Sequence, residues 1–80
     1  MKHACLCCGN RTLDEAPGGT FEICPVCYWE DDDAQARDPG FEGGANALSL
    51  NEARANYERL GVSDPRFADK VRKPTPGEAA

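Results

Sequence analysis

The clearest pattern of apolar and polar positions lies in residues 49–61, where it predicts an α-helix. Ser49 and Glu52 form a capping-box pattern at its start, and Gly61 is of the residue type that most often ends helices. The apolar positions recur at helical spacing and therefore share one face, which we expect to pack against the core. These positions are Leu50, Ala53, Tyr57 and Leu60.

A second pattern, earlier in the chain, predicts a β-hairpin. Arg11–Glu15 and Thr20–Ile23 are expected to form two short strands joined by a turn at Pro17-Gly18-Gly19. Phe21 and Ile23 alternate with polar residues, so we expect them on the buried face of the second strand.

The remaining segments carry weaker patterns. Residues 30–48 show neither a helical nor a strand period, and so long a stretch is usually functional or held in place by side-chain contacts. Ser63-Asp64-Pro65 predicts the start of a second, shorter helix, because Pro is favoured at the first helical position. Phe67 and Val71 are expected on its buried side.

These elements predict one domain, residues 1–73, followed by a flexible tail, residues 74–80. A chain of this size buries only about 60–65 % of the surface that it exposes when unfolded. This one has a single Trp, three Phe and two Tyr to fill a core. Domains with so few core residues usually need disulfides or a metal ion.

The spacing of the cysteines favours a metal. Cys5 and Cys8 are separated by two residues, as are Cys24 and Cys27, and 15 residues lie between the pairs. This spacing is typical of a four-cysteine zinc site, in which two tight turns direct their sulfurs at one ion. Residues 1–20 contain no apolar run that could form the core of a signal peptide, so we expect a cytoplasmic protein with reduced thiols.

The predicted fold class is therefore a small, metal-stabilised α+β domain. It is expected to be a zinc ribbon, made of two cysteine turns and a short β-hairpin, packed on a C-terminal helix. Iron is the alternative to zinc, since a tetrahedron of four thiolates accepts either ion. We expect Cys7 to be a small apolar filler, with a redox-active thiol or a substitute ligand as alternatives. His3 could also substitute as a ligand, but we expect it to lie in solvent.

The same residues resemble a known family. Cys5-Leu6-Cys7-Cys8-Gly9 and the run from Ile23 to Asp32 are similar to motifs of the bacterial cysteine-rich CPCC family. Leu6 is a departure, since it replaces the proline of the family's name. The resemblance implies a zinc-binding protein and implies no particular activity. Later segments extend it over nearly the whole chain: Gly43–Asn46, Ser49–Leu50 with Ala53–Arg54, Asn56–Tyr57, and Val71–Pro74.

The net charge of −5 is concentrated in the middle of the chain. Residues 30–46 contain six carboxylates against Arg37 alone. Such a surface repels phosphate backbones, so nucleic acid is not expected as a partner. An aromatic residue beside these carboxylates predicts a docking surface for a basic protein, and an ordinary solvated loop is the plain alternative.

Two further roles for this region are open from the sequence. Arg54, at the edge of the helix's apolar face, is expected either to reach back to Asp31 or Asp32 or to lie in solvent. Asn46 and Asn56 could cap free backbone groups of the loop. The candidate residues for a partner surface or a loop anchor are Trp29, Glu30, Asp31, Asp32, Asp33 and Arg54.

Together these features predict a non-catalytic binding module with a structural zinc ion, acting as an adaptor or inhibitor of another protein. A closed four-cysteine site leaves no coordination position open for a substrate. A single histidine and no nucleophile with an evident base offer little for catalysis. A redox protein, either rubredoxin-like or acting through Cys7, is the first alternative. A weakly nucleic-acid-binding zinc ribbon is the second, through the basic residues Arg66, Lys70, Arg72 and Lys73.

Overall fold

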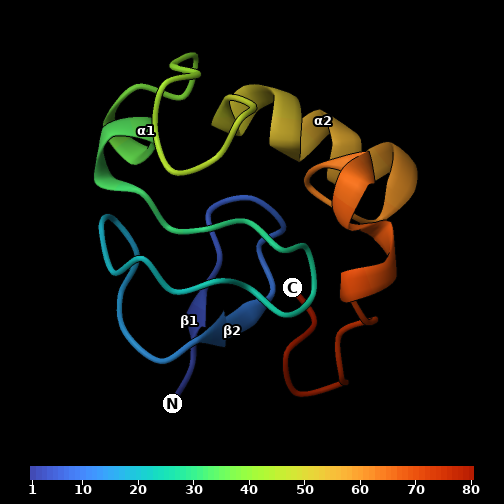
Figure 1. The fold of residues 1–80 in the computed structure, drawn as a ribbon. Helices are drawn as coiled ribbons and strands as arrows, with labels where there is room; N and C mark the ends of the chain where they lie inside the picture. Colours follow the sequence, from blue (N-terminus) through green and yellow to red (C-terminus); the bar gives the residue numbers. More distant parts are fainter.

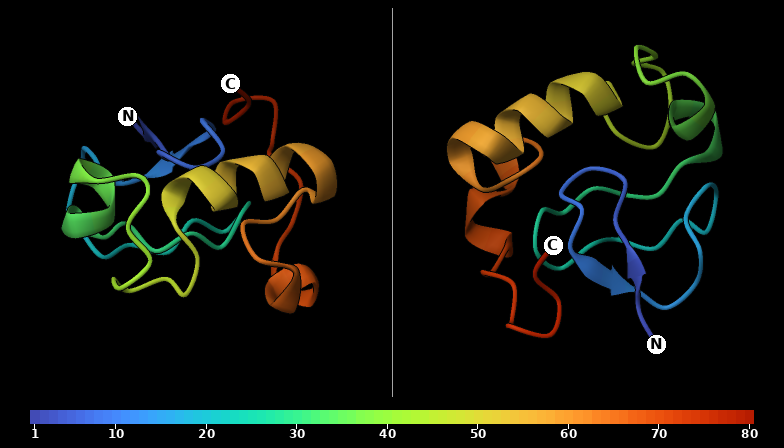
Figure 2. Two further views of the ribbon diagram at one scale, coloured as in Figure 1. Left: turned by 90° about the horizontal axis from the view of Figure 1, so that it is seen from above. Right: turned by 180° about the vertical axis from the view of Figure 1, so that it is seen from behind.

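The computed structural model describes all 80 residues. Helix α2 lies along one end of the molecule, the strands lie below it, and η1 flanks them (Figures 1 and 2). None of the helices has the length and apolar character to span a membrane. The elements in chain order are β1 His3–Ala4, β2 Arg11–Leu13, α1 Asp33–Arg37, α2 Leu50–Leu60 and the 3-10 helix η1 Pro65–Lys70.

Helix α2 begins and ends as its sequence predicts. The Ser49 hydroxyl accepts a hydrogen bond from the Glu52 N–H, and the Glu52 carboxylate accepts one from the Ser49 N–H, both at 3.1 Å. Gly61 ends the helix in the left-handed conformation, with φ of 78°. The predicted capping box and terminating residue are confirmed.

The apolar face of α2 is buried at its start and exposed at its end. Leu50 and Ala53 lie in the core, and Tyr57 packs at its edge. Leu60 is 52 % exposed, so its predicted core position is wrong. The core is too small to reach the last turn of the helix.

A β-hairpin is present, but the predicted pairing is wrong. Strand β1 pairs antiparallel with β2, with His3 opposite Leu13, so this hairpin encloses the first cysteine turn. Thr20–Ile23 is not a strand, and Ile23 forms only an isolated antiparallel bridge with Glu30 across the second cysteine turn. Each segment pairs across its own cysteine turn, because the hydrogen bonds of that turn bring its two ends together.

The predicted burial of Phe21 and Ile23 is also wrong, since their side chains are 55 % and 47 % exposed. Phe21 has φ of 60°, which breaks the strand alternation from which the prediction was made. Its N–H donates to the Asp31 carbonyl at 2.8 Å, and its side chain is left outside.

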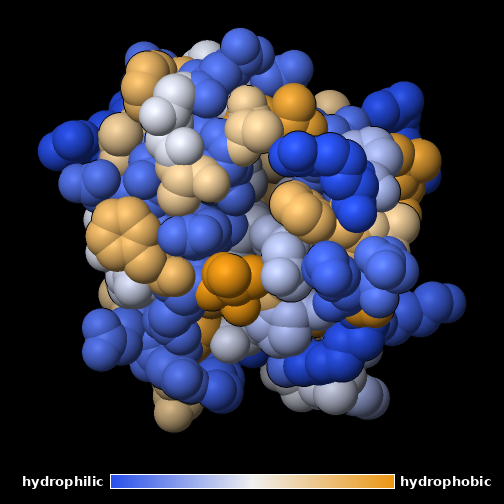
Figure 3. Space-filling view, in the orientation of Figure 1, coloured by the Kyte–Doolittle hydropathy of each residue, from blue (hydrophilic) through white to orange (hydrophobic).

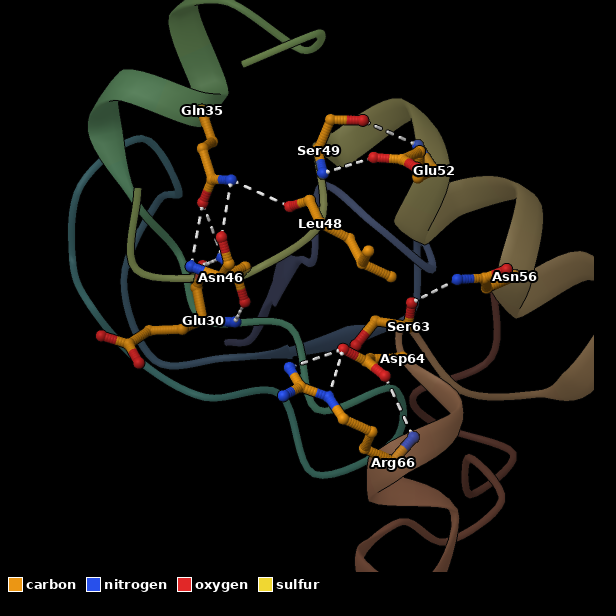
Figure 4. A network of polar contacts seen from close by, with 10 residues as sticks. All are labelled: Glu30, Gln35, Asn46, Leu48, Ser49, Glu52, Asn56, Ser63, Asp64 and Arg66. Carbon is orange, nitrogen blue, oxygen red and sulfur yellow. Dashed lines mark hydrogen bonds and ion pairs between the residues drawn. The ribbon is translucent and has the colours of Figure 1, made fainter. Parts of the chain in front are cut away.

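Residues 30–48 contain one short helix that the sequence analysis did not predict, α1. The Asp32 carboxylate caps it by accepting a hydrogen bond from the Gln35 N–H at 2.9 Å. The Gln35 side chain is fully buried, and it points toward Asn46 and Leu48 (Figure 4). Side-chain contacts thus hold the irregular stretch, as expected. The Gln35 amide nitrogen donates to the carbonyls of Phe41, Asn46 and Leu48 at 2.9 to 3.2 Å.

Asn46 joins this loop to the second cysteine turn. Its side chain accepts from the Glu30 N–H at 3.0 Å and donates to the Glu30 carbonyl at 2.8 Å (Figure 4). The capping role predicted for Asn46 is confirmed. Asn56 caps a backbone carbonyl too, that of Ser63 at 3.0 Å, but this carbonyl follows α2 and is not part of the loop.

The second short helix begins where predicted and is the 3-10 helix η1, capped by Asp64. Phe67 and Val71 are half-buried rather than part of the core. The Phe67 ring packs on Tyr28, with the ring centroids 4.7 Å apart. This contact places η1 beside the second cysteine turn.

Residues 74–80 contact the rest of the domain. The Arg11 N–H at the start of β2 donates to the Glu78 carbonyl at 2.7 Å. The Glu78 carboxylate forms an ion pair with Arg72 at 2.8 Å, and this arginine lowers the pKa of Glu78 to about 2. The flexibility of this segment stays a prediction, but the structure places it against the first strand pair.

The core is built around the cysteines. Only 18 of the 80 residues are buried, and nine of these form a single hydrophobic cluster. With so few apolar contacts, the packing of the core depends on what holds the sulfurs together. The cluster contains Cys5, Cys7, Leu13, Cys24, Val26, Cys27, Trp29, Leu50 and Ala53.

Candidate metal centre

The first cysteine pair lies on a tight turn. The Gly9 N–H donates to the Cys5 carbonyl, and the Cys5 N–H donates to the Asn10 carbonyl, both at 2.9 Å. Gly9 has φ of 79°, the left-handed conformation expected for the residue after the second ligand of such a turn. This turn brings the sulfurs of Cys5 and Cys8 to the same side.

The second pair repeats the same backbone pattern. The Tyr28 N–H donates to the Cys24 carbonyl at 2.8 Å, and the Cys24 N–H donates to the Trp29 carbonyl at 3.0 Å. Tyr28 occupies the position of Gly9 and has φ of 69°, although it carries a side chain. Two turns of equal geometry therefore face each other.

The four predicted ligand sulfurs converge. The Sγ atoms of Cys5 and Cys27 are 3.6 Å apart, and those of Cys8 and Cys24 are 3.8 Å apart. All four lie within 4.8 Å of one another, and no disulfide joins them. Bonds of about 2.3 Å from one Zn²⁺ to four thiolates place the sulfurs about 3.8 Å apart. The sulfur positions therefore fit a tetrahedral metal ion.

Contacts among the sulfurs shift the pKa values of the thiols in opposite directions. The pKa of the Cys24 thiol is lowered, chiefly by hydrogen bonding from Cys27 and then from the other two cysteines. The pKa of Cys27 is raised, chiefly by the same contact with Cys24. Thiolates packed this closely repel one another, and a divalent cation at their centre removes that repulsion.

Two further groups donate to the sulfurs. The Thr12 hydroxyl lies 3.0 Å from the Cys24 Sγ, and the Cys7 N–H donates to the Cys5 Sγ at 3.4 Å. Such contacts stabilise thiolates and orient metal ligands. The sequence analysis missed Thr12. No signal in the sequence pointed to it, because alternation in the strand Arg11–Leu13 puts Thr12 on the face opposite the buried Leu13.

Helix α2 and the segment after it hold the two turns. Arg54 donates through Nε to the Leu6 carbonyl at 2.8 Å, and the Ser63 N–H donates to the Cys27 carbonyl at 2.8 Å. The alternative in which Arg54 pairs with Asp31 or Asp32 is wrong. From α2 its guanidinium meets the first cysteine turn before it could reach the acidic run.

A buried asparagine provides a third link. Asn10 is 4 % exposed, and its amide nitrogen donates to the Tyr57 hydroxyl at 3.0 Å. Its side-chain oxygen accepts from the Ala80 N–H at 3.0 Å. One side chain thus connects the first turn, α2 and the last residues of the chain, a role the sequence analysis did not predict.

Trp29, Asp31 and Asp32 are buried, which contradicts their interpretation as a docking surface, whereas Asp31 and Asp32 fit the alternative of a loop anchor. Trp29 and Asp31 are each 2 % exposed, and Asp32 caps α1. Glu30 is half-buried, and Asp33 is exposed in an ion pair with Arg37. The sequence of an acidic run does not show which of its carboxylates will be buried and accept hydrogen bonds from backbone N–H groups.

Asp31 holds the glycine turn that precedes the second cysteine pair. Its carboxylate accepts from the N–H groups of Gly18, Gly19 and Thr20 at 2.8 to 3.0 Å, and from the Thr20 hydroxyl at 2.9 Å. Burial by itself raises the pKa of Asp31, but these donors favour the ionised form and the net shift is downward.

Cys7 and His3 lie where the plainer predictions put them. Cys7 is buried in the core and is not one of the four converging cysteines. This confirms its predicted position as an apolar filler. His3 is exposed on β1 and is likewise outside the sulfur cluster.

The fold and site define a small cysteine-rich domain with four thiols placed to bind one metal ion. The family model described as "Cysteine-rich CPCC" matches residues 3–78. The chain therefore belongs to the cysteine-rich CPCC family. A comparison with curated proteins found no match.

Proposed function

We propose that this protein is a zinc-ribbon binding module, in which one Zn²⁺ on Cys5, Cys8, Cys24 and Cys27 is structural. The observation that carries the proposal is the convergence of four sulfurs at tetrahedral spacing. Four thiolates complete the coordination of zinc and leave no position for a substrate. The ion would then act by joining the two cysteine turns.

The small core supports a metal that is needed for folding. Structural zinc in small cysteine sites contributes on the order of 10–16 kcal/mol at neutral pH. Whole domains are stable by only about 5–15 kcal/mol. Since three of the nine core residues, Cys5, Cys24 and Cys27, are proposed ligands, loss of the ion would remove the contacts that join the centre of the core.

The non-catalytic role rests on the chemistry of the site. A closed tetrahedron offers neither a Lewis acid nor a metal-bound water. Nucleic-acid binding receives less support, because two members of the basic strip are paired within the chain, Arg66 with Asp64 and Arg72 with Glu78. We therefore propose that the partner of this module is a protein.

Metal analysis and chelation test the proposal. Protein purified without added metal should contain about one equivalent of zinc and be colourless, whereas four-thiolate iron would be red. Removal of the ion with a chelator should abolish the near-UV circular dichroism, and zinc should restore it. A native spectrum after confirmed metal removal would refute the structural role, and stoichiometric iron would favour the rubredoxin-like alternative.

A further inference from the structure

A groove of about 840 Å³ lies between the last turns of α2 and the segment Val71–Pro74. It is far larger than the other hollows of this surface. On the face seen in Figure 3, hydrophobic residues are interspersed with hydrophilic ones. The groove is distinguished instead by what lies along it, since two cysteines of the first turn, Cys7 and Cys8, are among its lining residues.

The four proposed zinc ligands differ in how well the protein covers them. Cys5, Cys24 and Cys27 are buried, with at most 3 % of each residue exposed, and none of them lines the groove. Cys8 is only half-buried and does line it. A small reagent in the groove would therefore reach Cys8 before any other ligand.

A partly exposed zinc ligand is a target for oxidants. Coordination keeps a cysteine in the thiolate form, which is the nucleophile, and the susceptibility of a thiolate to oxidation rises with its exposure. Cys7 lines the same groove, but it is only 8 % exposed and is not one of the four converging cysteines. No metal ion would hold Cys7 as a thiolate, so Cys8 should react first.

We infer that Cys8 is the site at which hydrogen peroxide oxidises the metal centre, and that this oxidation releases zinc. The inference rests on the proposed function, since it describes how a module that depends on structural zinc would be inactivated. It differs from the redox alternative raised by the sequence, in which the reactive thiol is that of Cys7.

The oxidation proceeds in two steps with peroxide as the oxidant. The Cys8 thiolate attacks one oxygen of H₂O₂ and the O–O bond breaks, which gives a sulfenic acid on Cys8 and a hydroxide ion. The Cys24 thiolate, whose Sγ lies 3.8 Å from that of Cys8, then attacks the sulfenic sulfur, forms a disulfide and displaces a second hydroxide. The two sulfurs have supplied the two electrons that reduce the peroxide, and the hydroxides take up protons to become water. Only two thiolates then remain for an ion that needs four ligands, so zinc is lost.

Mass spectrometry of the zinc-loaded protein tests this inference. Peroxide is added with dimedone, which traps sulfenic acids, and Cys8 should carry at least about ten times more dimedone than any other cysteine. Without dimedone, peroxide should release about one equivalent of zinc to a chromogenic chelator and leave a Cys8–Cys24 disulfide. Retention of zinc, or a disulfide that omits Cys8, would overturn the inference. A disulfide from Cys8 to another cysteine would refute Cys24 as the second thiol.

Limiting iodoacetamide provides a second measurement, which does not depend on trapping a short-lived sulfenic acid. It should alkylate Cys8 first in the zinc-loaded protein, and zinc release should follow alkylation. After chelation this preference should disappear, because unfolding exposes all five cysteines. First alkylation of any other cysteine in the zinc-loaded protein would contradict the assignment of Cys8.

Cys7→Ser is the matched control, since Cys7 lines the same groove but is not a proposed ligand. It should change the rate of peroxide-driven zinc release by less than about twofold. A rate lowered about tenfold would identify Cys7 as the attacked thiol and refute the inference. Zinc content is measured before oxidation. Protein that holds no zinc would refute the proposed module, whereas zinc-loaded protein in which Cys8 does not react first would refute this inference alone.

Discussion

The Asp31 carboxylate is buried among three backbone N–H groups and one hydroxyl, all within 3.0 Å. These donors belong to residues 18–20, which have no regular secondary structure of their own. At the residue scale, this one carboxylate therefore accepts the hydrogen bonds of the loop's backbone N–H groups, as a neighbouring strand does in a sheet. Its removal would leave several donors without an acceptor.

Asp31→Asn should lower the free energy of unfolding by about 2–3 kcal/mol, because a charged acceptor is lost and the new amide group faces N–H donors. Urea unfolding of the zinc-loaded protein measures this change. Asp33→Asn is the matched control. Asp33 is exposed and its ion pair with Arg37 spans 3.8 Å, so the control should change stability by less than about 0.5 kcal/mol.

The difference between wild type and Asp31→Asn should also depend on pH. The pKa of Asp31 is lowered from its ordinary value of 3.8, so folding favours its ionised form. Its contribution is complete well above that value and is lost as the pH falls through the lower pKa of the folded state. Loss of zinc at low pH unfolds both proteins, so the two are compared over the pH range in which both retain zinc. A difference that grew as the pH fell through this range would contradict this account.

Gly9→Ala should destabilise the protein by about 1–2 kcal/mol, the cost of the left-handed conformation for a residue with a Cβ. An added Cβ would meet only Ala80, at an ordinary 3.7 Å, so the cost is that of the backbone alone. Thermal unfolding should show the loss. Gly77→Ala, at a position with open space and no positive φ, should be neutral or slightly stabilising. Equal effects of the two changes would rule out this explanation.

At the element scale, α1 and the loop after it depend on Gln35. Its amide nitrogen donates to the carbonyls of three loop residues. Its oxygen accepts from the Asn46 side chain at 2.9 Å (Figure 4). Gly44 passes so close that an added Cβ would lie 2.7 Å from that oxygen. The loop thus packs around the buried Gln35 side chain.

Gln35→Glu should loosen the loop without a change of size, because a carboxylate would face three carbonyls that need a donor. We expect a loss of stability of about 2–3 kcal/mol and faster amide hydrogen exchange in residues 30–48. Amide hydrogen exchange in α2 should change less, since the capping box at the start of this helix does not involve Gln35. Asn51→Asp, at an exposed position, is the matched amide control and should leave exchange in the loop unchanged. If amide exchange in the loop were as slow in Gln35→Glu as in the wild type, the anchoring role of Gln35 would be refuted.

At the scale of the whole molecule, the four sulfurs join two turns that come from separate parts of the chain. The Cys5–Cys27 contact spans 22 residues and the Cys8–Cys24 contact spans 16. Helix α2 bonds the first turn through Arg54, and the segment after it bonds the second. A change at the metal centre is therefore expected to affect both cysteine turns and α2.

Cys8→Ser should release zinc and unfold the domain, because one of four thiolates is lost. Cys7→Ser should retain about one zinc and a native near-UV spectrum, with a loss of stability of about 1 kcal/mol from the added polarity in the core. Metal analysis and circular dichroism of the two variants, purified in parallel, measure this contrast. If Cys7→Ser released zinc and Cys8→Ser retained it, Cys7 would be the ligand and Cys8 would not.

The local features of this protein could be predicted from the sequence. The capping box of α2, the glycine that ends it, the cap of η1 and the spacing of the cysteines each involve residues within a few positions of one another. Their geometry is set by the hydrogen bonds of one helical turn or one tight turn, so the residue types suffice. The metal centre is predictable for the same reason, since it consists of two such turns.

Contacts between distant segments decided the rest. The sequence carried no signal that Arg54 would bond Leu6, 48 residues away, or that Asp31 would be taken up by a glycine turn 13 residues earlier. The strand pairing depends on which segments the two cysteine turns bring together. The exposure of Leu60 and the groove beside it depend on how far a small core extends. Many carboxylates and carbonyls compete for each donor in a folded chain. Which of them meet is determined by the tertiary arrangement and by no single stretch of sequence.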